Sequence, residues 1–455
     1  MNKTLKTNLA CTLLLPDDGC TAEKKISETG SISITGTYDM TITGYDWGCG
    51  IESIIMNLDH PLDSVTADAF TVVENKQATN FTAEGFPVED VELERKITDA
   101  YLVDEKGEKT TDPSTHVKLE LYVSPNDGSP LLFTLSTQYN TWSKPYTLTV
   151  SETDDAKLTS NGTEVKEFTI NPEAASKTTS ADRYQMHSYQ AEDGVTYQYA
   201  SYEPEGGSKT LVVWLHGLGE GGTEDTDPSV TLLANKAGTL ADEPFQTAVG
   251  GANILVPQCP TYWMDNDGKK TNFSGGAIQA DGTSYYLASL HELIAKYKEE
   301  TGSTKVVITG CSNGGYMTML MAINYGDEYD AYVPICEALP NALITDDQVK
   351  ALAGLDMYYV YSEDDTTVDP SLHEAPLLKR LEKTGAKHTY VSTTEHVVDT
   401  TSVYFMDENG QPTLEDTGTP YQYMGHWSWL YFFNNECDAN GLKVWDFIAD
   451  ADALK

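Results

Sequence analysis

The stretch that decides the fold is KVVITGCSNGGYMTMLMAINY, residues 305–325. It opens with a compact apolar run, residues 305–310, of the kind found in strands that are buried on both faces. A glycine-rich turn follows at once, and residues 314–324 then have the pattern of a helix. The stretch therefore predicts a strand, a tight turn and a helix, with Ser312 at the bend.

The turn has the pattern Gly-x-Ser-x-Gly, formed by Gly310, Ser312 and Gly314. Glycines two residues before and after the serine remove side chains that would collide in so sharp a bend. The bend holds the Ser312 hydroxyl above the sheet, and the start of the helix favours a developing negative charge. We expect Ser312 to be a nucleophile; the alternative is a structural turn with an idle serine.

The same alternation of short apolar runs and helical patterns extends through the second half of the chain. Helical patterns at residues 284–300 and 376–383 alternate with short apolar runs. This alternation predicts an α/β domain over residues 184–455, in which helices cover both faces of a doubly wound, mostly parallel sheet. The other apolar runs are residues 210–217, 252–258, 331–336 and 357–362.

The first half of the chain has a different sequence pattern. Residues 31–183 are rich in Thr, Ser and Val, and they fall into short alternating runs separated by turn signals. This pattern predicts an all-β sandwich of immunoglobulin-like architecture. We interpret the polar segment 171–183 as a linker, and residues 1–30 as a disordered segment or a degenerate export signal.

Charge and composition restrict the function. The chain has 29 Lys and Arg against 70 Asp and Glu, a net charge of −41, which disfavours binding to nucleic acid or anionic lipid. No window has the ~20 apolar residues of a membrane span. The seven cysteines are widely spaced, and no metal-binding motif is present, so we expect buried thiols, no metal and no cofactor. We expect an extracellular or cell-surface location, with the cytoplasm as the alternative. The oligomeric state is left open.

A second glycine-rich loop follows the apolar run 210–215. It contains His216, Gly217 and Leu218. A loop of this kind after a strand can supply a backbone N–H to an oxyanion. We expect that donor to be Leu218, with the N–H of Asn313 as the second donor. His216 is expected to be a buried residue that shapes the loop. A phosphate-binding loop is disfavoured because no Gly-Lys-Ser/Thr follows.

Two further residues would complete a catalytic triad with Ser312, in the chain order Ser, Asp, His. Asp365 follows the run 357–362 and has the setting Asp-x-x-Val; its neighbour Asp364 is the alternative. His426 follows a glycine in the loop before residues 430–433, and His396 is its competitor. The aromatic residues Trp263 and Trp427 lie in loops where they could line a substrate pocket.

These motifs resemble those of α/β-hydrolases of the carboxylesterase, dienelactone-hydrolase and prolyl-oligopeptidase group. The stretch TGYDWG, residues 43–48, resembles the immunoglobulin-like domain that precedes the hydrolase in certain two-domain bacterial esterases. The long segment between His396 and His426 departs from the pattern; it includes a predicted hairpin at 403–416. The resembling stretches are LHGLGEGG, VPQCP, ITGCSNGGYMT, SEDDTTV and GHWSW.

The resemblance implies hydrolysis of a carboxylic ester through an acyl-enzyme, without a metal or an organic cofactor. The expected substrate is a small-molecule or polysaccharide-linked ester, such as an acetyl or feruloyl ester. Two alternatives remain open. One is a serine peptidase of the prolyl-oligopeptidase type, and the other is a non-catalytic binding protein built on a hydrolase scaffold.

Overall fold

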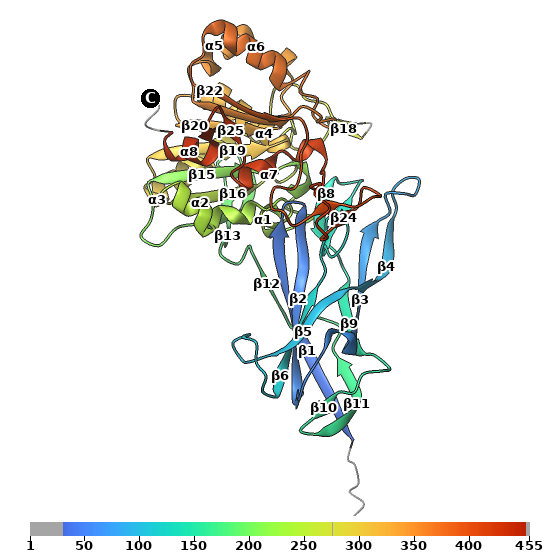
Figure 1. Cartoon of the computed structure of the whole chain (residues 1–455). Coiled ribbons are helices and arrows are strands. Elements are labelled where there is room, and N and C mark those ends of the chain that lie inside the picture. The colour runs from blue at the N-terminus through green and yellow to red at the C-terminus, as the bar shows by residue number, and fades with distance from the viewer. Residues whose placement is uncertain (1–30, 275, 452–455) are drawn as a thin grey trace, which may run out of the picture.

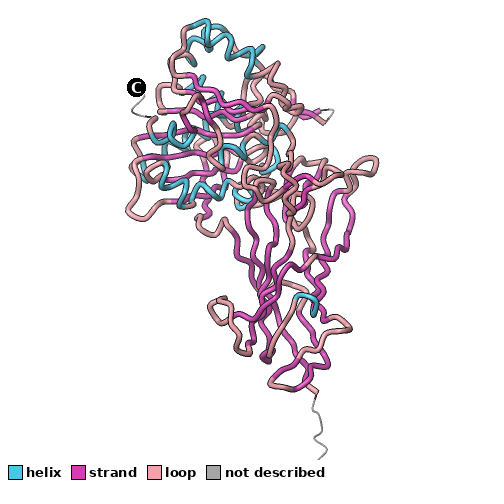
Figure 2. The backbone as a smooth tube through the Cα atoms, in the orientation of Figure 1, coloured by secondary structure: helices cyan, strands magenta, loops and turns pink. Residues whose placement is uncertain are grey.

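The computed structural model of the chain describes residues 31–274 and 276–451. The predictions for residues 1–30 lie outside this range. Figure 1 shows two domains stacked end to end: a β-sandwich built from the first half of the chain, and an α/β domain built from the second. Figure 2 shows that strands dominate the first domain, whereas the helices lie mostly in the second.

The N-terminal domain consists of two facing sheets and a short hairpin. In the larger sheet β1 (Ile32–Tyr45) and β2 (Gly48–Leu62) are joined by a tight turn. They pair antiparallel from Tyr45 opposite Gly48 to Gly36 opposite Leu58. Buried residues alternate with less buried ones along β1, as expected for a strand with one face toward a core. The strand order of the larger sheet is β10 (Thr159–Ser160), β11 (Thr163–Ile170), β1 (Ile32–Tyr45), β2 (Gly48–Leu62), β6 (Ser114–Leu121) and β5 (Ile97–Val103).

The smaller sheet and the hairpin complete this domain. The smaller sheet has the order β4 (Val88–Arg95), β3 (Phe70–Thr79) and β9 (Tyr146–Glu152). The hairpin pairs β7 (Leu131–Thr134) with β8 (Tyr139–Trp142), and in Figure 1 it points toward the α/β domain. A one-turn 3₁₀ helix, Ala67–Ala69, precedes β3. Buried apolar side chains of the two sheets pack into one cluster, which is the core of the sandwich.

The linker prediction for residues 171–183 is wrong in part. Residues 176–179 form β12 (Ser176–Thr179), which pairs in parallel with β1 at the edge of the larger sheet. An edge strand can be polar because both its faces stay largely exposed, so hydrophobic alternation does not reveal it. The next strand, β13, starts at Gln185 in the second domain.

The second domain is built on an eight-stranded sheet in which six neighbouring strands, from β16 at one end to β22 at the other, run parallel. Strands β15, β16, β19 and β20 are buried at every residue, which explains their continuous apolar sequences. An antiparallel hairpin that the sequence analysis missed extends one edge. The strand order is β13 (Gln185–Gln190), β14 (Thr196–Tyr202), β16 (Asn253–Gln258), β15 (Thr210–Leu215), β19 (Lys305–Cys311), β20 (Ala331–Ile335), β21 (Met357–Ser362) and β22 (Thr389–Thr394).

Helices cover both faces of this sheet, and successive residues of each strand face opposite cores. On β15, Val212 and Trp214 belong to one apolar cluster, whereas Leu211 and Val213 belong to the other. The first face is covered by α1 (Ser229–Leu233), α2 (Glu243–Ala248), α7 (Trp429–Phe433) and α8 (Val444–Ala449); the second is covered by α3 (Leu287–Thr301), α4 (Asn313–Tyr325), α5 (Asp346–Leu352) and α6 (Glu374–Thr384). The doubly wound fold predicted from the sequence is confirmed.

Short elements occupy the loops of the second domain. The predicted hairpin at 403–416 is confirmed in its core, where β23 (Phe405–Met406) pairs with β24 (Pro412–Thr413). Two further hairpins are β17 (Phe273–Ser274) with β18 (Ala277–Ile278), and β25 (Asp438–Ala439) with β26 (Leu442–Lys443). The 3₁₀ helices are Leu218–Glu220, Ala237–Ala241, Asn341–Leu343 and Gly425–Trp427.

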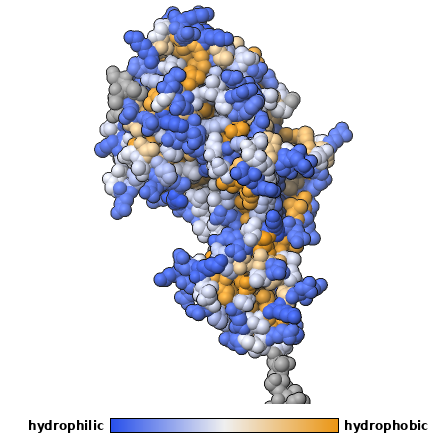
Figure 3. Space-filling view, in the orientation of Figure 1, coloured by the Kyte–Doolittle hydropathy of each residue, from blue (hydrophilic) through white to orange (hydrophobic). Residues whose placement is uncertain are grey.

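The two domains share one apolar cluster. It runs from the sandwich core to the face of the α/β sheet where Trp214 of β15 packs against Phe432 of α7. At the rim of this contact the Lys236 ammonium lies 2.7 Å from a carboxylate oxygen of Asp46 and donates to the side-chain oxygen of Asn434. Figure 3 shows apolar side chains at the junction of the domains, surrounded by hydrophilic ones. The domains are therefore packed together rather than tethered.

The five cysteines among the described residues, at positions 49, 259, 311, 336 and 437, are buried free thiols. None of the helices in residues 31–274 and 276–451 is long and apolar enough to cross a membrane.

Candidate active site

Ser312 lies at the bend between β19 and α4, in a backbone conformation that is strained for a residue with a side chain. Its φ is 55° and its ψ is −116°. The backbone N–H of Ser312 donates to the Ile335 carbonyl at 2.8 Å, and its carbonyl accepts from the N–H of Tyr316. These two bonds hold the bend in place between the neighbouring strand and the helix.

The glycines around Ser312 are required by the close approach of other backbone atoms. A Cβ at Gly314 would lie 2.0 Å from the carbonyl oxygen of Leu215, at the end of β15. A Cβ at Gly310 would lie 2.7 Å from the Gly314 carbonyl oxygen, and one at Gly315 would lie 2.7 Å from the carbonyl oxygen of Ile335. Only glycine therefore lets α4 start so close to the sheet.

The structure brings together the three residues predicted as a triad. Nε2 of His426 lies 2.9 Å from Oγ of Ser312, and Nδ1 of the same ring lies 2.7 Å from Oδ2 of Asp365. Asp365 is buried, and its other oxygen accepts the backbone N–H groups of Thr367 and Val368 at 2.8 and 2.9 Å. The carboxylate is thus fixed, and it fixes the imidazole that faces the serine.

The loop that carries His426 needs a glycine for a second close approach. A Cβ at Gly425 would lie 2.2 Å from the Oδ1 atom of Asp364 and 2.7 Å from the Asp364 carbonyl oxygen. The 425–427 turn therefore lies directly on the loop after β21. That close contact places the ring of His426 beside the carboxylate of Asp365.

The two competing residues pair with each other instead. Nδ1 of His396 lies 2.8 Å from Oδ2 of Asp364, and the His396 side chain is about half exposed. The hydrogen bond that the His396 ring donates to the Asp364 carboxylate raises the pKa of His396 above its ordinary value. This pair lies at the surface, outside the hydrogen-bonded chain that contains Ser312.

The loop after β15 is organised by His216. The ring is fully buried; its Nε2 accepts the backbone N–H of Cys259 at 2.9 Å, and its Nδ1 donates to the Gly217 carbonyl at 2.5 Å. Burial lowers the pKa of His216 to about 4, so the ring is neutral near pH 7. His216 therefore shapes the loop and does not reach Ser312.

The two predicted N–H donors come from the starts of short helical segments. Leu218 opens the 3₁₀ turn 218–220, and Asn313 is the first residue of α4. The first N–H groups of a helix lack intrahelical acceptors and point outward. The side chain of Asn313 is bound elsewhere, because its Oδ1 accepts the backbone N–H of Trp263 at 2.6 Å. The turn that bears Asn313 is thereby tied to the loop after β16.

A cavity of about 390 Å³ opens over Ser312 and His426. Its walls include Leu218, Trp427 and Trp429 from the α/β domain. Phe133 and Gln138 of the β7–β8 hairpin also line it. The N-terminal domain therefore contributes part of the wall. No local motif could predict this contribution, because it depends on how the domains dock.

The prediction for Trp263 as a pocket residue is wrong. Its side chain has no exposed surface and packs against the rings of Tyr197 and His216, with centroid distances of 6.3 and 5.2 Å. Trp263 lies in the loop after β16, and its side chain belongs to the apolar cluster on that face of the sheet. Trp427, by contrast, lies in the cavity wall.

The β7–β8 hairpin also holds the glycine-rich loop. The amide Nδ2 of Asn140 donates to the Gly219 carbonyl at 3.2 Å. A Cβ at Gly222 would lie 2.4 Å from a ring carbon of the buried Tyr139, which explains the glycine there. Next to this contact, the Trp142 indole N–H donates to Asp227 at 3.0 Å. The loop that bears Leu218 is therefore clamped from the N-terminal domain.

Glu220 is a buried carboxyl group beside the cavity that the sequence analysis did not single out. Burial raises the pKa of Glu220 to about 7, and nearby backbone N–H groups oppose the shift only in part. One of its oxygens, Oε2, lacks a hydrogen-bond partner. Near neutral pH the protonated and the charged form of this carboxyl are therefore both populated.

Within the part of the chain that the structure describes, no three or more His, Cys, Asp or Glu side chains are grouped so that they could hold a metal ion.

Comparison with known families gives a match in the N-terminal domain. Residues 37–166 match the family model described as the esterase Ig-like N-terminal domain. This match confirms the resemblance drawn from residues 43–48 and the immunoglobulin-like prediction. A search of curated protein sequences gave no match.

Comparison with solved structures supports the fold of the whole chain. A structure described as a thermostable esterase has a TM-score of 0.66 and 21% identity, over 88% of this chain and 96% of the other. A ferulic acid esterase and Est1E from Butyrivibrio proteoclasticus each cover 46% of this chain and 89% of their own, with identities of 11% and 16% and TM-scores of 0.34 and 0.30. The first match confirms an immunoglobulin-like domain followed by an α/β-hydrolase fold.

The glycine contacts predict the effect of a single methyl group. Gly314→Ala would place its Cβ against the Leu215 carbonyl, so we expect a loss of about 3 kcal/mol in the free energy of unfolding. Denaturant-induced unfolding measures this loss. The control is Gly354→Ala, whose Cβ would have an ordinary contact of 3.5 Å. Equal stability of the two variants would contradict the close approach.

The buried carboxyl predicts a pH-dependent stability. The pKa of Glu220 is near 4.5 in the unfolded chain and about 7 in the folded one, so its contribution is complete below pH 4.5 and is lost as the pH rises through 7. Between pH 5 and 8 the wild type should lose ~3 kcal/mol more than Glu220→Gln. Urea unfolding at both pH values tests this, with the exposed Glu224→Gln as control. Parallel pH profiles for wild type and Glu220→Gln would refute it.

Proposed function

We propose that this protein is a serine carboxylesterase that uses Ser312, His426 and Asp365 as a catalytic triad. The observation that carries the proposal is the hydrogen-bonded chain from Ser312 through His426 to Asp365 at a strained strand–helix bend. A serine alone is a weak nucleophile at neutral pH, and an adjacent base held by a carboxylate activates it.

The first half of the reaction forms an acyl-enzyme. His426 takes the proton from Oγ of Ser312 while that oxygen attacks the ester carbonyl carbon. Asp365 holds the ring with Nδ1 protonated and stabilises the imidazolium. The imidazolium then gives its proton to the leaving alcohol oxygen as the ester C–O bond breaks.

The second half returns the enzyme to its starting state. A water molecule gives a proton to His426 and attacks the acyl carbon, and the bond to Ser312 breaks as its oxygen regains the proton. In both halves the carbonyl oxygen becomes an anion. The backbone N–H groups of Leu218 and Asn313 would stabilise it, and the loss of one such donor costs on the order of 10²–10³ in rate.

The cavity supports a substrate with a small or flat acyl group. Its volume is about 390 Å³, and its walls combine Leu218, Phe133 and tryptophan rings with few charges. We infer acetyl or feruloyl-type esters of small molecules or polysaccharides. The descriptions of the family model and structures that this chain resembles agree with ester hydrolysis. They name an esterase Ig-like domain, a thermostable esterase and a ferulic acid esterase.

Substrate panels separate this proposal from its alternatives. Esters and amides with the same acyl group distinguish an esterase from a serine peptidase. A fluorophosphonate probe should label Ser312, and a non-catalytic binding protein would stay unlabelled. The acyl preference follows from a panel that runs from acetyl to long-chain and feruloyl esters.

The triad is tested by alanine substitutions at Ser312 and His426. The control is His396, a second histidine that faces a carboxylate. Ser312→Ala and His426→Ala should lower kcat for p-nitrophenyl acetate by at least ~10⁴-fold, because nucleophile and base act as a unit. His396→Ala is the matched control and should retain turnover, since its ring pairs with Asp364 at the surface. Thermal unfolding checks the fold of each variant. Full turnover by Ser312→Ala would overturn the proposal.

The clamp on the glycine-rich loop predicts a role for the N-terminal domain in the rate. Asn140→Asp has the same shape but removes the N–H donor to the Gly219 carbonyl. We expect kcat to fall roughly tenfold while KM changes little, because the Leu218 N–H is displaced from the developing anion. Thr141→Ala, the next residue on β8, serves as control. A change in KM alone would show that Asn140 acts on binding instead.

A further inference from the structure

A second cavity lies at the junction of the domains, beside the one over Ser312. It encloses about 350 Å³, within the ~300–1,000 Å³ typical of ligand sites. Strands β2 and β3 and the turn at 125–129 form most of it, and Trp427 closes it from the α/β domain. The triad makes no use of this space.

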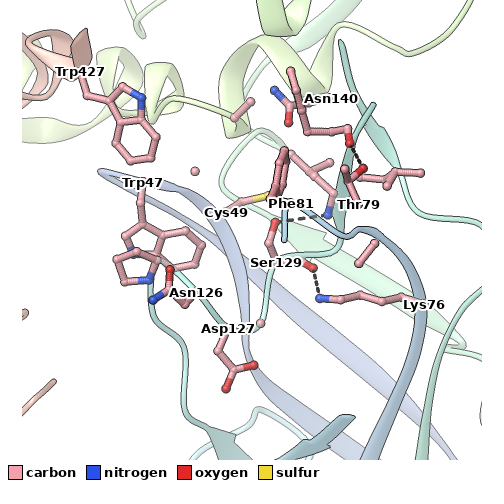
Figure 4. Close-up of a pocket in the computed structure, with 18 residues that line it drawn as sticks. Trp47, Cys49, Lys76, Thr79, Phe81, Asn126, Asp127, Ser129, Asn140 and Trp427 are labelled. Carbon is pink, nitrogen blue, oxygen red and sulfur yellow. Dashed lines mark hydrogen bonds between the residues drawn. The ribbon is translucent and has the colours of Figure 1, made fainter. Parts of the chain in front are cut away.

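Aromatic side chains from both domains face this cavity. Figure 4 shows Trp47 and Trp427 on one side and Phe81 across from them. The Trp47 ring is held flat against Tyr45, with a centroid distance of 5.1 Å and an interplanar angle of 1°. Phe81 is 59% exposed, and its ring lies 6.3 Å from that of Phe133 between centroids. Such rings offer flat, electron-rich faces to C–H groups.

The polar groups beside these rings include two amides and two charged groups, and the carboxyl of Asp127 is one of the charged groups. Asp127 lies 3.7 Å from Nε of the buried Arg95, so its charge is already paired. Asn126 lies beside Trp47, and Asn140 lies at the far end of the cavity (Figure 4). Asn140 donates to the carbonyl of Gly219, which lines the cavity over Ser312. The lining cation, Lys76, is already bound, because it donates to the Ser129 carbonyl at 2.8 Å and lies 3.1 Å from Glu74. The net charge of −41 further disfavours an anionic ligand. Aromatic faces with amides suit a neutral, hydroxyl-rich ligand.

The two cavities share two residues, Phe133 from the N-terminal domain and Trp427 from the α/β domain. An acyl group bound over Ser312 would leave the alcohol part of the ester to extend past this pair. The second cavity is where that part would lie.

We propose that this cavity is a subsite for the glycosyl part of a sugar ester, in which Trp47 and Phe81 stack on sugar rings. The inference rests on the proposed esterase function and adds the class of alcohol. It makes the immunoglobulin-like domain a substrate-binding element, and it places the bond to be cleaved at the boundary between the domains.

Binding to the full chain carrying Ser312→Ala tests the subsite without turnover. The probes are xylotetraose, cellotetraose and mannotetraose, and isothermal titration calorimetry measures the affinity. We expect at least one to bind, and we expect Phe81→Ala and Asn126→Ala, added separately, to weaken that binding about tenfold for the ring and less for the amide. Both residues are exposed, so the variants should fold. Leu93→Ala, an exposed apolar position on β4 that lines neither cavity, should bind like its parent.

The outcomes separate the two proposals. Hydrolysis of p-nitrophenyl acetate by the wild type reports on the triad alone. If that ester is cleaved but none of the three tetrasaccharides binds, or if Phe81→Ala binds as tightly as its parent, the subsite is overturned and the esterase stands. Binding of 2-naphthaleneethanol in place of every sugar would assign the cavity to an apolar alcohol and would also overturn the proposal.

Discussion

The structure depends on one constraint: the start of α4 must lie against the end of β15. The Leu215 carbonyl oxygen occupies the space that a side chain at residue 314 would need. This contact forces the chain to turn within a few residues, and the turn places Ser312 at a positive φ. The strain is held by the hydrogen bond to Ile335 and by the burial of β19 at every residue. The position of the hydroxyl thus follows from packing in the sheet.

Other parts of the site are brought to this point by similar close contacts. Gly425 lets the loop of His426 lie on the loop after β21, and Gly222 lets the glycine-rich loop lie on Tyr139 of the N-terminal domain. The neutral His216 ring then hydrogen-bonds to the backbone at Gly217 and at Cys259, and so links these two loops. The site is assembled from four loops, each fixed by backbone contacts rather than by side chains alone. Its geometry should therefore be rigid before substrate arrives.

The immunoglobulin-like domain belongs to this assembly. Its core continues into one face of the α/β sheet, and its β7–β8 hairpin lines the cavity over Ser312. The proposed glycosyl subsite extends the same relation, since Trp47 and Trp427 come from different domains. A domain that contributes a cavity wall and a loop clamp is more than a spacer. In the proposed subsite it would also restrict which alcohols can lie beside the acyl group.

The sequence by itself determined what local periodicity and glycine spacing encode: the doubly wound sheet, the sandwich, the bend at Ser312, and the residues Asp365 and His426. It did not reveal β12 or the β13–β14 hairpin, because polar edge strands lack an apolar signal. Only the tertiary structure decided that His396 pairs with Asp364, that Trp263 is buried away from the cavity, and that Phe133 and Asn140 reach the site. The physical reason is that these facts depend on contacts between residues far apart in the chain, and such contacts are set by how the sheets and domains pack.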